Sequence, residues 1–254
     1  MNEQSPGTFD LSVTLSTLAD PAPPAVSEWE FETVKHWAKN WLSKSHPNLG
    51  RTGAVCPFTG TSIKKNLFRV AFVRGNNLDH DKMVGLLEEI AAAFPVLPPV
   101  DGPESIYKAV VVVFPEVTEF GQIDAVQDEC KNAFVKRGLM VGQFYPGHQQ
   151  GGLRNPDFRP LDAPFAMLAV RHMVVTDYPF LCGSEKWMVA YVARFAPAIS
   201  VTCPLGDPQE VWRPDRATTP FDNSTPAGSA QRRLVPRFSV DANSRQSRSR
   251  LKLR

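Results

Sequence analysis

The sequence lacks the features that mark membrane, secreted and disulfide-stabilised proteins. No apolar run approaches the roughly 20 residues that a membrane-spanning helix needs. Residues 1–24 contain no basic segment followed by an apolar one, as a secretory leader would. The four cysteines form no CxxC pair and lack the spacing of a small disulfide-bonded domain. We therefore expect reduced thiols, a cytoplasmic location and no membrane span.

What is present is typical of a globular protein of one or two domains. The chain has 254 residues, of which 43% are hydrophobic and 21% charged, enough to bury a sizeable core. Proline gathers at 21–24, 95–103 and 204–226, as in linkers and rigid loops. We expect a disordered arm over 1–26, a single α/β catalytic or ligand-binding domain over 27–200, and a proline-rich then basic tail over 201–254.

The small net charge of +2 hides an asymmetry. Residues 231–254 carry eight basic side chains against Asp241 alone, which leaves the rest of the chain acidic. A basic tail on an acidic body can contact nucleic acid or a membrane surface. Because aromatic residues are not interleaved with the charges, we expect a solvated tail instead and no nucleic-acid partner.

Regular secondary structure is predicted to begin at Ser27. Ser27 and Glu30 form a capping-box pattern, and Val34, Trp37 and Trp41 follow at helical spacing until Pro47. Beyond this amphipathic helix, segments rich in β-branched residues alternate with helical periods. Strands are predicted at 66–74, 107–114, 139–144 and 165–176, and helices at 79–94, 122–137 and 185–195.

This alternation predicts an α/β fold of the α+β sandwich type. We expect a mixed central sheet of at least four strands, with the continuous apolar strand 107–114 in its interior, helices packed on it and irregular terminal arms. Residues before Ser27 and after about 218 should lack regular structure, because their composition buries too little apolar surface.

The first unusual segment is the glycine-punctuated loop 50–60, which presents Cys56. A thiol near an arginine and backbone amides can act as a nucleophile or a metal ligand. The alternative is that Cys56 is simply a small buried side chain. The spacing of Gly53 and Gly60 does not fit a phosphate-binding P-loop, and we expect a strand to follow rather than a helix.

The second unusual segment, 145–160, concentrates polar side chains between two predicted strands. His148 lies between glycines and prolines, so a ligand or acid–base role competes with that of a surface histidine. Arg154 and Arg159 could clamp a carboxylate, or pair with acids and brace the loop. We expect Cys56, His148, Arg154 and Arg159 to converge on one cavity at the strand ends.

Arg171 and His172 lie inside the last predicted strand, where charged side chains need partners or a water-filled cavity. A structural network is the favoured interpretation of His172, and catalysis is the alternative. Zinc is poorly supported, because the five histidines and four cysteines include no HxxxH, HxH or CxxC motif.

The Cys56-Pro57-Phe58 loop, the strand Leu67-Phe68-Arg69-Val70-Ala71-Phe72 and the histidine-containing block 145–160 prompt a resemblance. They resemble a bacterial domain-of-unknown-function family found near biosynthetic genes and, distantly, the YqcI/YcgG-type haem-dependent N-hydroxylases. The second resemblance spans about 50–195. It implies haem b with His148 as the iron ligand, arginines that hold the propionates, and oxygen or peroxide chemistry on an amine. The arginines assigned to cofactor binding are Arg154, Arg159 and Arg171.

Three hypotheses follow for the function. The first is a haem-binding oxidoreductase that N-oxygenates an amine in a biosynthetic pathway, with Cys56 and His172 as candidate catalytic residues. The second is a cofactor-free transferase or hydrolase with Cys56 as nucleophile and His148 or His172 as base. The third is a non-enzymatic ligand-binding or partner protein. We expect a small-molecule substrate, and a homodimer is a possible assembly.

Overall fold

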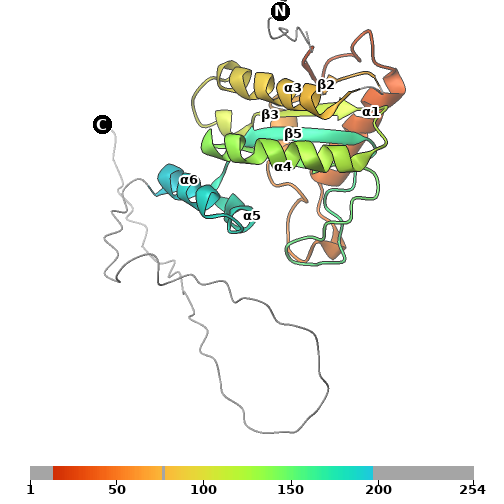
Figure 1. Cartoon of the computed structure of the whole chain (residues 1–254). Coiled ribbons are helices and arrows are strands. Elements are labelled where there is room, and N and C mark those ends of the chain that lie inside the picture. The colour runs from red at the N-terminus through yellow and green to blue at the C-terminus, as the bar shows by residue number, and fades with distance from the viewer. Residues whose placement is uncertain (1–13, 76–77, 197–254) are drawn as a thin grey trace, which may run out of the picture. The chain divides into compact units, whose positions relative to one another are not determined.

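A computed structural model describes residues 14–75 and 78–196 and places a five-stranded sheet at the centre of the fold (Figure 1). The strand order is β1-β2-β3-β5-β4. Strands β2 and β3 are parallel, whereas β1 pairs antiparallel with β2, and β5 pairs antiparallel with both β3 and β4. The sheet is therefore mixed, as predicted. The bounds are β1 Ser16–Thr17, β2 Phe68–Phe72, β3 Ala109–Phe114, β4 Leu139–Phe144 and β5 Ala166–His172.

Helices cover both faces of the sheet. The helices are α1 Glu28–Trp37, α2 Thr59–Lys64, α3 His80–Ala93, α4 Phe120–Lys136, α5 Tyr178–Leu181 and α6 Glu185–Phe195. Figure 1 shows α3 and α4 side by side in front of the sheet and α1 behind it. A five-residue π-helical turn, Ala38–Leu42, extends α1, and short 3-10 turns occupy Pro47–Leu49, Phe94–Val96, Ser105–Tyr107 and Val175–Asp177.

The central strand β3 supplies side chains to the cores on both faces. Val110 and Val112 pack in the cluster beneath α3 and α4, whereas Val111 and Val113 pack in the cluster beneath α1. All four are buried, which explains why this segment is continuously apolar instead of alternating. The prediction of an interior strand at 107–114 is confirmed.

Helix α1 begins as its sequence predicts. The Ser27 hydroxyl accepts a hydrogen bond from the Glu30 amide, and the Glu30 carboxylate accepts one from the Ser27 amide, so the capping box is complete. Burial acts to raise the pKa of Glu30. The ion pair with Arg74 and the hydrogen bonds from Ser27 outweigh this effect, so the pKa of Glu30 is lowered. The start of the helix is thus tied to the segment that follows β2.

Two expectations about the less regular segments were wrong. The arm ahead of Ser27 is not wholly irregular, because Ser16–Thr17 pair with β2 and Leu18 is buried beneath α1. The segment after Pro57 contains the short helix α2 before the strand begins. The region expected to be irregular after residue 218 lies outside the described residues.

The carboxyl-terminal part of the described chain folds as two helices beside α4. Leu181 from α5 and Trp187 from α6 pack with Val135 and Met140 in a third, smaller apolar cluster. The chain divides into two units, Met1–Val201 and Thr202–Arg254, and the second lies outside the described residues. Within the described ranges, no helix is both long and apolar enough to cross a membrane.

Candidate functional site

The two loops singled out by the sequence are in contact. A side chain at Gly50 would clash with Arg154, because an added Cβ would lie 2.8 Å from the Arg154 Cβ. The side-chain amide of Asn155 donates a hydrogen bond of 2.8 Å from its Nδ2 to the Asn48 carbonyl, and the ring of Phe158 stacks on His46 at 4.8 Å between centroids. The segment 46–50 that leads into the first loop thus lies against the second loop, whereas the convergence of Cys56, His148, Arg154 and Arg159 on one cavity stays a prediction.

The two arginines of the second loop differ in what they contact. Arg159 donates to the carbonyls of Pro156 and Phe158, so its guanidinium braces the turn in which it lies. Arg154 is exposed and its backbone packs on Gly50. Of the two roles considered for Arg159, clamping a carboxylate or bracing the loop, these contacts support bracing.

His148 is buried within an acidic and aromatic cluster at the end of β4. Its side chain is 5% exposed, and its ring stacks on Tyr145 at 4.2 Å between centroids. The His148 Nδ1 accepts a hydrogen bond from the Gln150 amide, so the neutral ring carries its proton on Nε2. That Nε2 faces the Asp124 Oδ1 at 3.9 Å, too far for a direct bond.

Asp124 joins the cluster from α4. Its Oδ2 accepts a 2.8 Å hydrogen bond from the Tyr145 hydroxyl, while its Oδ1 and the His148 Nε2 are buried without a hydrogen-bond partner. Burial and the Asp124 bond raise the pKa of Tyr145 to about 12. Burial lowers the pKa of His148, against the attraction of Asp124 and Asp162. The cluster therefore favours a neutral imidazole between two carboxylates.

These residues do not fit haem b in the predicted arrangement. An iron ligand needs a ring nitrogen directed at an open position. One nitrogen of His148 is occupied by the Gln150 amide, the other points at Asp124, and Tyr145 covers a ring face. Haem itself stays a prediction, and the absorption spectrum of the purified protein tests it.

Arg171 and His172 occupy the end of β5 in different environments. Arg171 donates to both oxygens of Asp177 at 2.7 and 2.6 Å, and Asp177 also accepts from the Val174 amide. Arg171 therefore has its charged partner in Asp177, whereas the structural network favoured for His172 stays a prediction. His172 lies edge-on to Phe94 at 5.0 Å, and burial together with the charges of Lys108 and Arg194 lowers its pKa to about 4.

Cys56 packs as a half-buried side chain in the apolar cluster beneath α1. Among residues 14–75 and 78–196, no hydrogen bond links its thiol to His148 or His172. In the same described ranges, no three His, Cys, Asp or Glu side chains are placed to hold a metal ion. The nucleophile–base pair proposed for a cofactor-free enzyme thus finds no support in the contacts.

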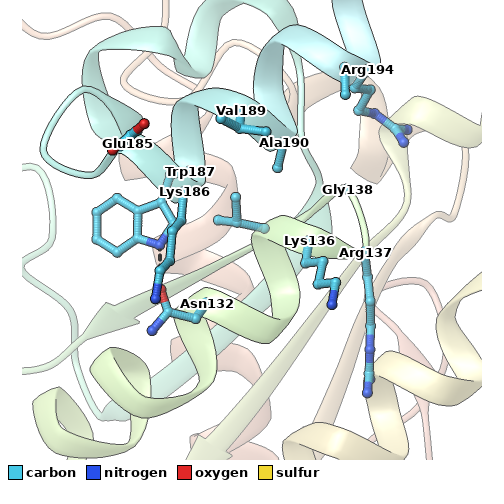
Figure 2. A pocket seen from close by; sticks show the side chains of 12 residues that line it. Asn132, Lys136, Arg137, Gly138, Glu185, Lys186, Trp187, Val189, Ala190 and Arg194 are labelled. Atoms are coloured by element: carbon cyan, nitrogen blue, oxygen red, sulfur yellow. Dashed lines mark hydrogen bonds between the residues drawn. The ribbon is translucent and has the colours of Figure 1, made fainter. Parts of the chain in front are cut away.

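A groove lies elsewhere, between the carboxyl-terminal half of α4 and helix α6. Its volume is about 900 Å³, within the range of small-molecule sites. The lining residues are Asn132, Val135, Lys136, Arg137, Gly138, Glu185, Lys186, Trp187, Val189, Ala190, Ala193 and Arg194. Four of them are cationic and one is anionic. Figure 2 shows Val189 and Ala190 between the Trp187 side and the Gly138 side of this groove.

Gly138 forms the turn on which one end of the groove depends. It ends α4 with a φ of +73°, and the guanidinium of Arg194 lies directly over it. An added Cβ would lie 2.3 Å from the Arg194 Nη1, so only glycine allows this approach. Lys136 and Arg137 precede this glycine and also line the groove, but their side chains extend away from Arg194 (Figure 2). The Arg137 guanidinium approaches Glu88 at 3.8 Å.

This groove was not predicted from the sequence. Its cationic residues are divided between positions 136–137 and 186–194, so they form no cluster along the chain. The only available signal was Gly138, a glycine that directly follows the predicted helix 122–137. Asp124 was also not predicted as a site residue, because it lies on the predicted helix 122–137 and not in a loop.

Comparisons with known proteins identify a family but no described function. The family model for a domain of unknown function (DUF6875) matches residues 31–204, which is more than half of the chain. Neither the curated proteins nor the solved structures include a match. The match contains every described helix except the start of α1, and all strands except β1.

Proposed function

Since the chain belongs to the DUF6875 family of unknown function, we propose from its own chemistry that it binds a small anionic molecule in the groove between α4 and α6. This is the third hypothesis of the sequence analysis, a ligand-binding protein. The observation that carries it is the excess of Lys136, Arg137, Lys186 and Arg194 over the single acid Glu185 around one concave surface.

Helix dipoles explain only part of this charge. Cationic side chains stabilise the last turn of a helix, which accounts for Lys136 in α4 and Arg194 in α6. Lys186 lies in the first turn of α6, where a cation is disfavoured. Dipole compensation also gives no reason for the ends of two helices to place their cations around one groove. An anionic ligand gives such a reason.

The pKa of His172 reflects the positive charge at this end of the sheet. After burial, the causes that lower the pKa of His172 are the charges of Lys108 and Arg194. Arg137 is only weakly neutralised, because its guanidinium lies 3.8 Å from Glu88 on an exposed surface. An anion at Gly138 would relieve the repulsion among these cations, which favours binding.

The test uses inorganic phosphate as the probe and the full-length chain. Phosphate is titrated at constant ionic strength while backbone amide resonances are followed by NMR, since screening by added salt would otherwise mimic competition. We expect shifts centred on residues 136–138 and 193–195. Arg194→Gln should weaken binding about tenfold, as loss of one charge-assisted hydrogen bond does.

The matched control is Arg154→Gln, which removes an exposed arginine from the loop that contacts Gly50. This variant should bind phosphate as the wild type does. If both variants weaken binding equally, phosphate responds only to net charge and the proposal is wrong. The absence of shifts around Gly138 in the wild type would overturn it as well.

A further inference from the structure

We infer that helices α5 and α6 dock on an anionic lipid surface, which supplies a headgroup phosphate as the anion of the groove. The inference rests on the proposed function and names the source of its ligand. It follows from an exposed apolar surface on these two helices and from the cations that are spread along it.

Helix α6 is apolar on nearly all sides, yet none of its residues is buried. Its charged residues are Glu185, Lys186 and Arg194. A helix of this composition is normally covered all round. On one side, Trp187 and Tyr191 pack against the third apolar cluster, whereas Val189 on another side stays exposed among the residues that the structure describes. That side therefore offers an apolar surface to a binding partner.

The uncovered side of α6 is a stripe of small and branched apolar side chains. Val192 and Ala193 follow Val189 by three and four residues, so all three lie on one face of the helix. All three are exposed. Lys186 precedes Val189 by three residues and adds a cation beside the stripe. Apolar side chains flanked by cations are typical of helices that lie at a membrane surface.

The exposed apolar surface continues on the segment that precedes α6, and Figure 1 shows α5 and α6 side by side. Val175, Tyr178 and Phe180 are all exposed. Tyr191 connects them to α6, because its ring lies 6.0 Å from the Tyr178 ring and its hydroxyl donates to the Val175 carbonyl at 2.7 Å. Between 174 and 184 the only charged residue is Asp177, which is buried in an ion pair. This segment therefore presents aromatic and branched side chains without an exposed charge.

The cations of the groove are spread along this surface and do not converge on one point. Lys186 and Arg194 lie toward opposite ends of α6, and Lys136 extends from α4 away from Arg194 (Figure 2). Glu185 is the only acid among the lining residues. Positive charge therefore remains in excess even when the arginine that approaches Glu88 is left out. Cations distributed in this way complement a surface with many anionic groups.

Three observations favour a lipid surface over a protein partner. Lysine is depleted in protein–protein interfaces but common beside apolar residues at membrane surfaces, and both Lys136 and Lys186 lie here. A second copy of this chain would bring the same cations together, which opposes pairing through this face. Residues 231–254 carry eight basic side chains and one acid, which adds long-range attraction to an anionic surface.

The test measures the binding of the full-length chain to large unilamellar vesicles by co-sedimentation. Vesicles of phosphatidylcholine alone are compared with vesicles that also contain phosphatidylglycerol. We expect binding to the anionic vesicles only, and weaker binding as salt is added. Equal binding to both kinds of vesicle, or binding to neither, would overturn the inference.

Val189→Ser has Leu153→Ser as its matched control. Both substitutions remove an exposed apolar side chain, since Val189 is 63% and Leu153 61% exposed. Leu153 lies in the loop that follows β4, whereas Gly138 and the groove lie at the start of that strand. Val189→Ser should weaken binding to the anionic vesicles about five- to twentyfold, because the valine is no longer removed from water there. Leu153→Ser should bind as the wild type does, and equal affinities of the two variants would contradict the inference.

Lys186→Gln and Arg154→Gln test the electrostatic part in the same way. Lys186→Gln should weaken binding to the anionic vesicles about fivefold, which is the usual contribution of one cation near such a surface. Arg154→Gln removes an exposed cation from the loop after β4 and should leave the affinity unchanged. Equal losses in both variants would show a response to net charge alone, and the inference would be wrong.

Light scattering without vesicles tests the alternative occupant of this face. A dimeric wild type and a monomeric Val189→Ser variant would show that the face pairs with a second copy, which would overturn the inference. If phosphate shifts the resonances around Gly138 but the chain binds no vesicles, the inference is wrong and the proposed function stands. If phosphate causes no such shifts, the proposed function is wrong and the headgroup assignment falls with it.

Discussion

His172 is the group through which the cationic end of the sheet can be measured. Its ring lies edge-on to Phe94, 5.0 Å away, on the last residue of β5. Burial and the charges of Lys108 and Arg194 lower its pKa from 6.5 to about 4. The perturbation is a fall in pH from 7 to 5, applied to the wild type and to His172→Gln.

The sign follows from the order of the two pKa values. The unfolded chain protonates His172 near 6.5, before the folded protein does, so the stabilisation is fully present above 6.5 and is lost as the pH falls toward 4. At 1.36 kcal/mol per pH unit, the loss at pH 5 is about 2 kcal/mol, and below pH 4 it approaches about 3 kcal/mol. Partial exposure of the ring makes these values upper limits.

Urea unfolding followed by tryptophan fluorescence at pH 7 and pH 5 provides the assay. Between these pH values, His172→Gln should lose about 2 kcal/mol less stability than the wild type, since carboxylates titrate alike in both. His36→Gln removes one exposed imidazole of α1 and serves as the control. Arg194→Gln, or saturation with phosphate, should raise the pKa of His172 in an NMR titration. An imidazole that titrates near 6.5 in the free wild type would refute the reasoning.

Three further predictions test the contacts around the site. Asp177→Ala should destabilise the protein by about 3 kcal/mol in urea unfolding, because it leaves Arg171 unpaired in a partly buried position, and a loss below about 1 kcal/mol would contradict this. Gly138→Ala and Gly102→Ala both place alanine at a positive φ and should each lower the free energy of unfolding by about 1 kcal/mol. Only Gly138→Ala should also weaken phosphate binding. Equal phosphate affinity of the two variants would be inconsistent with the role of Gly138. Phe158→Ala should cost about 3–4 kcal/mol and speed amide exchange in both loops, and unchanged exchange in the first loop would exclude coupling between them.

The elements with strong local signals were predictable from the sequence. The capping box fixed the start of α1, and the β-branched run at 107–114 identified the interior strand. Helix α6 matches its predicted bounds, and Pro197 follows shortly after its last residue. Strand β1 gives no such signal: two residues are too few for a period, and pairing with β2 alone makes them a strand. Helix α2 has Ile63 as its only large apolar residue, so it shows no helical stripe.

The candidate site was harder to predict because it depends on contacts between distant segments. His148 was identified by its loop, yet its environment is set by Asp124, which belongs to a helix more than twenty positions earlier. The polar residues of that loop mainly support its own turns, as Arg159 does with Pro156. The concentration of polar groups in this loop therefore correctly indicated a structured loop. The catalytic cavity that it also suggested finds no support in the contacts.

The groove illustrates the opposite case, in which ordinary residues acquire a function only through packing. Lys136 and Arg137 resemble any cationic end of a helix, and Arg194 resembles another, in the sequence. Arg194 approaches the end of α4 because Gly138 adopts a left-handed turn that leaves room for the guanidinium over its Cα. The sheet and its helices should survive a substitution at Gly138, whereas the position of the Arg194 guanidinium over this turn should not.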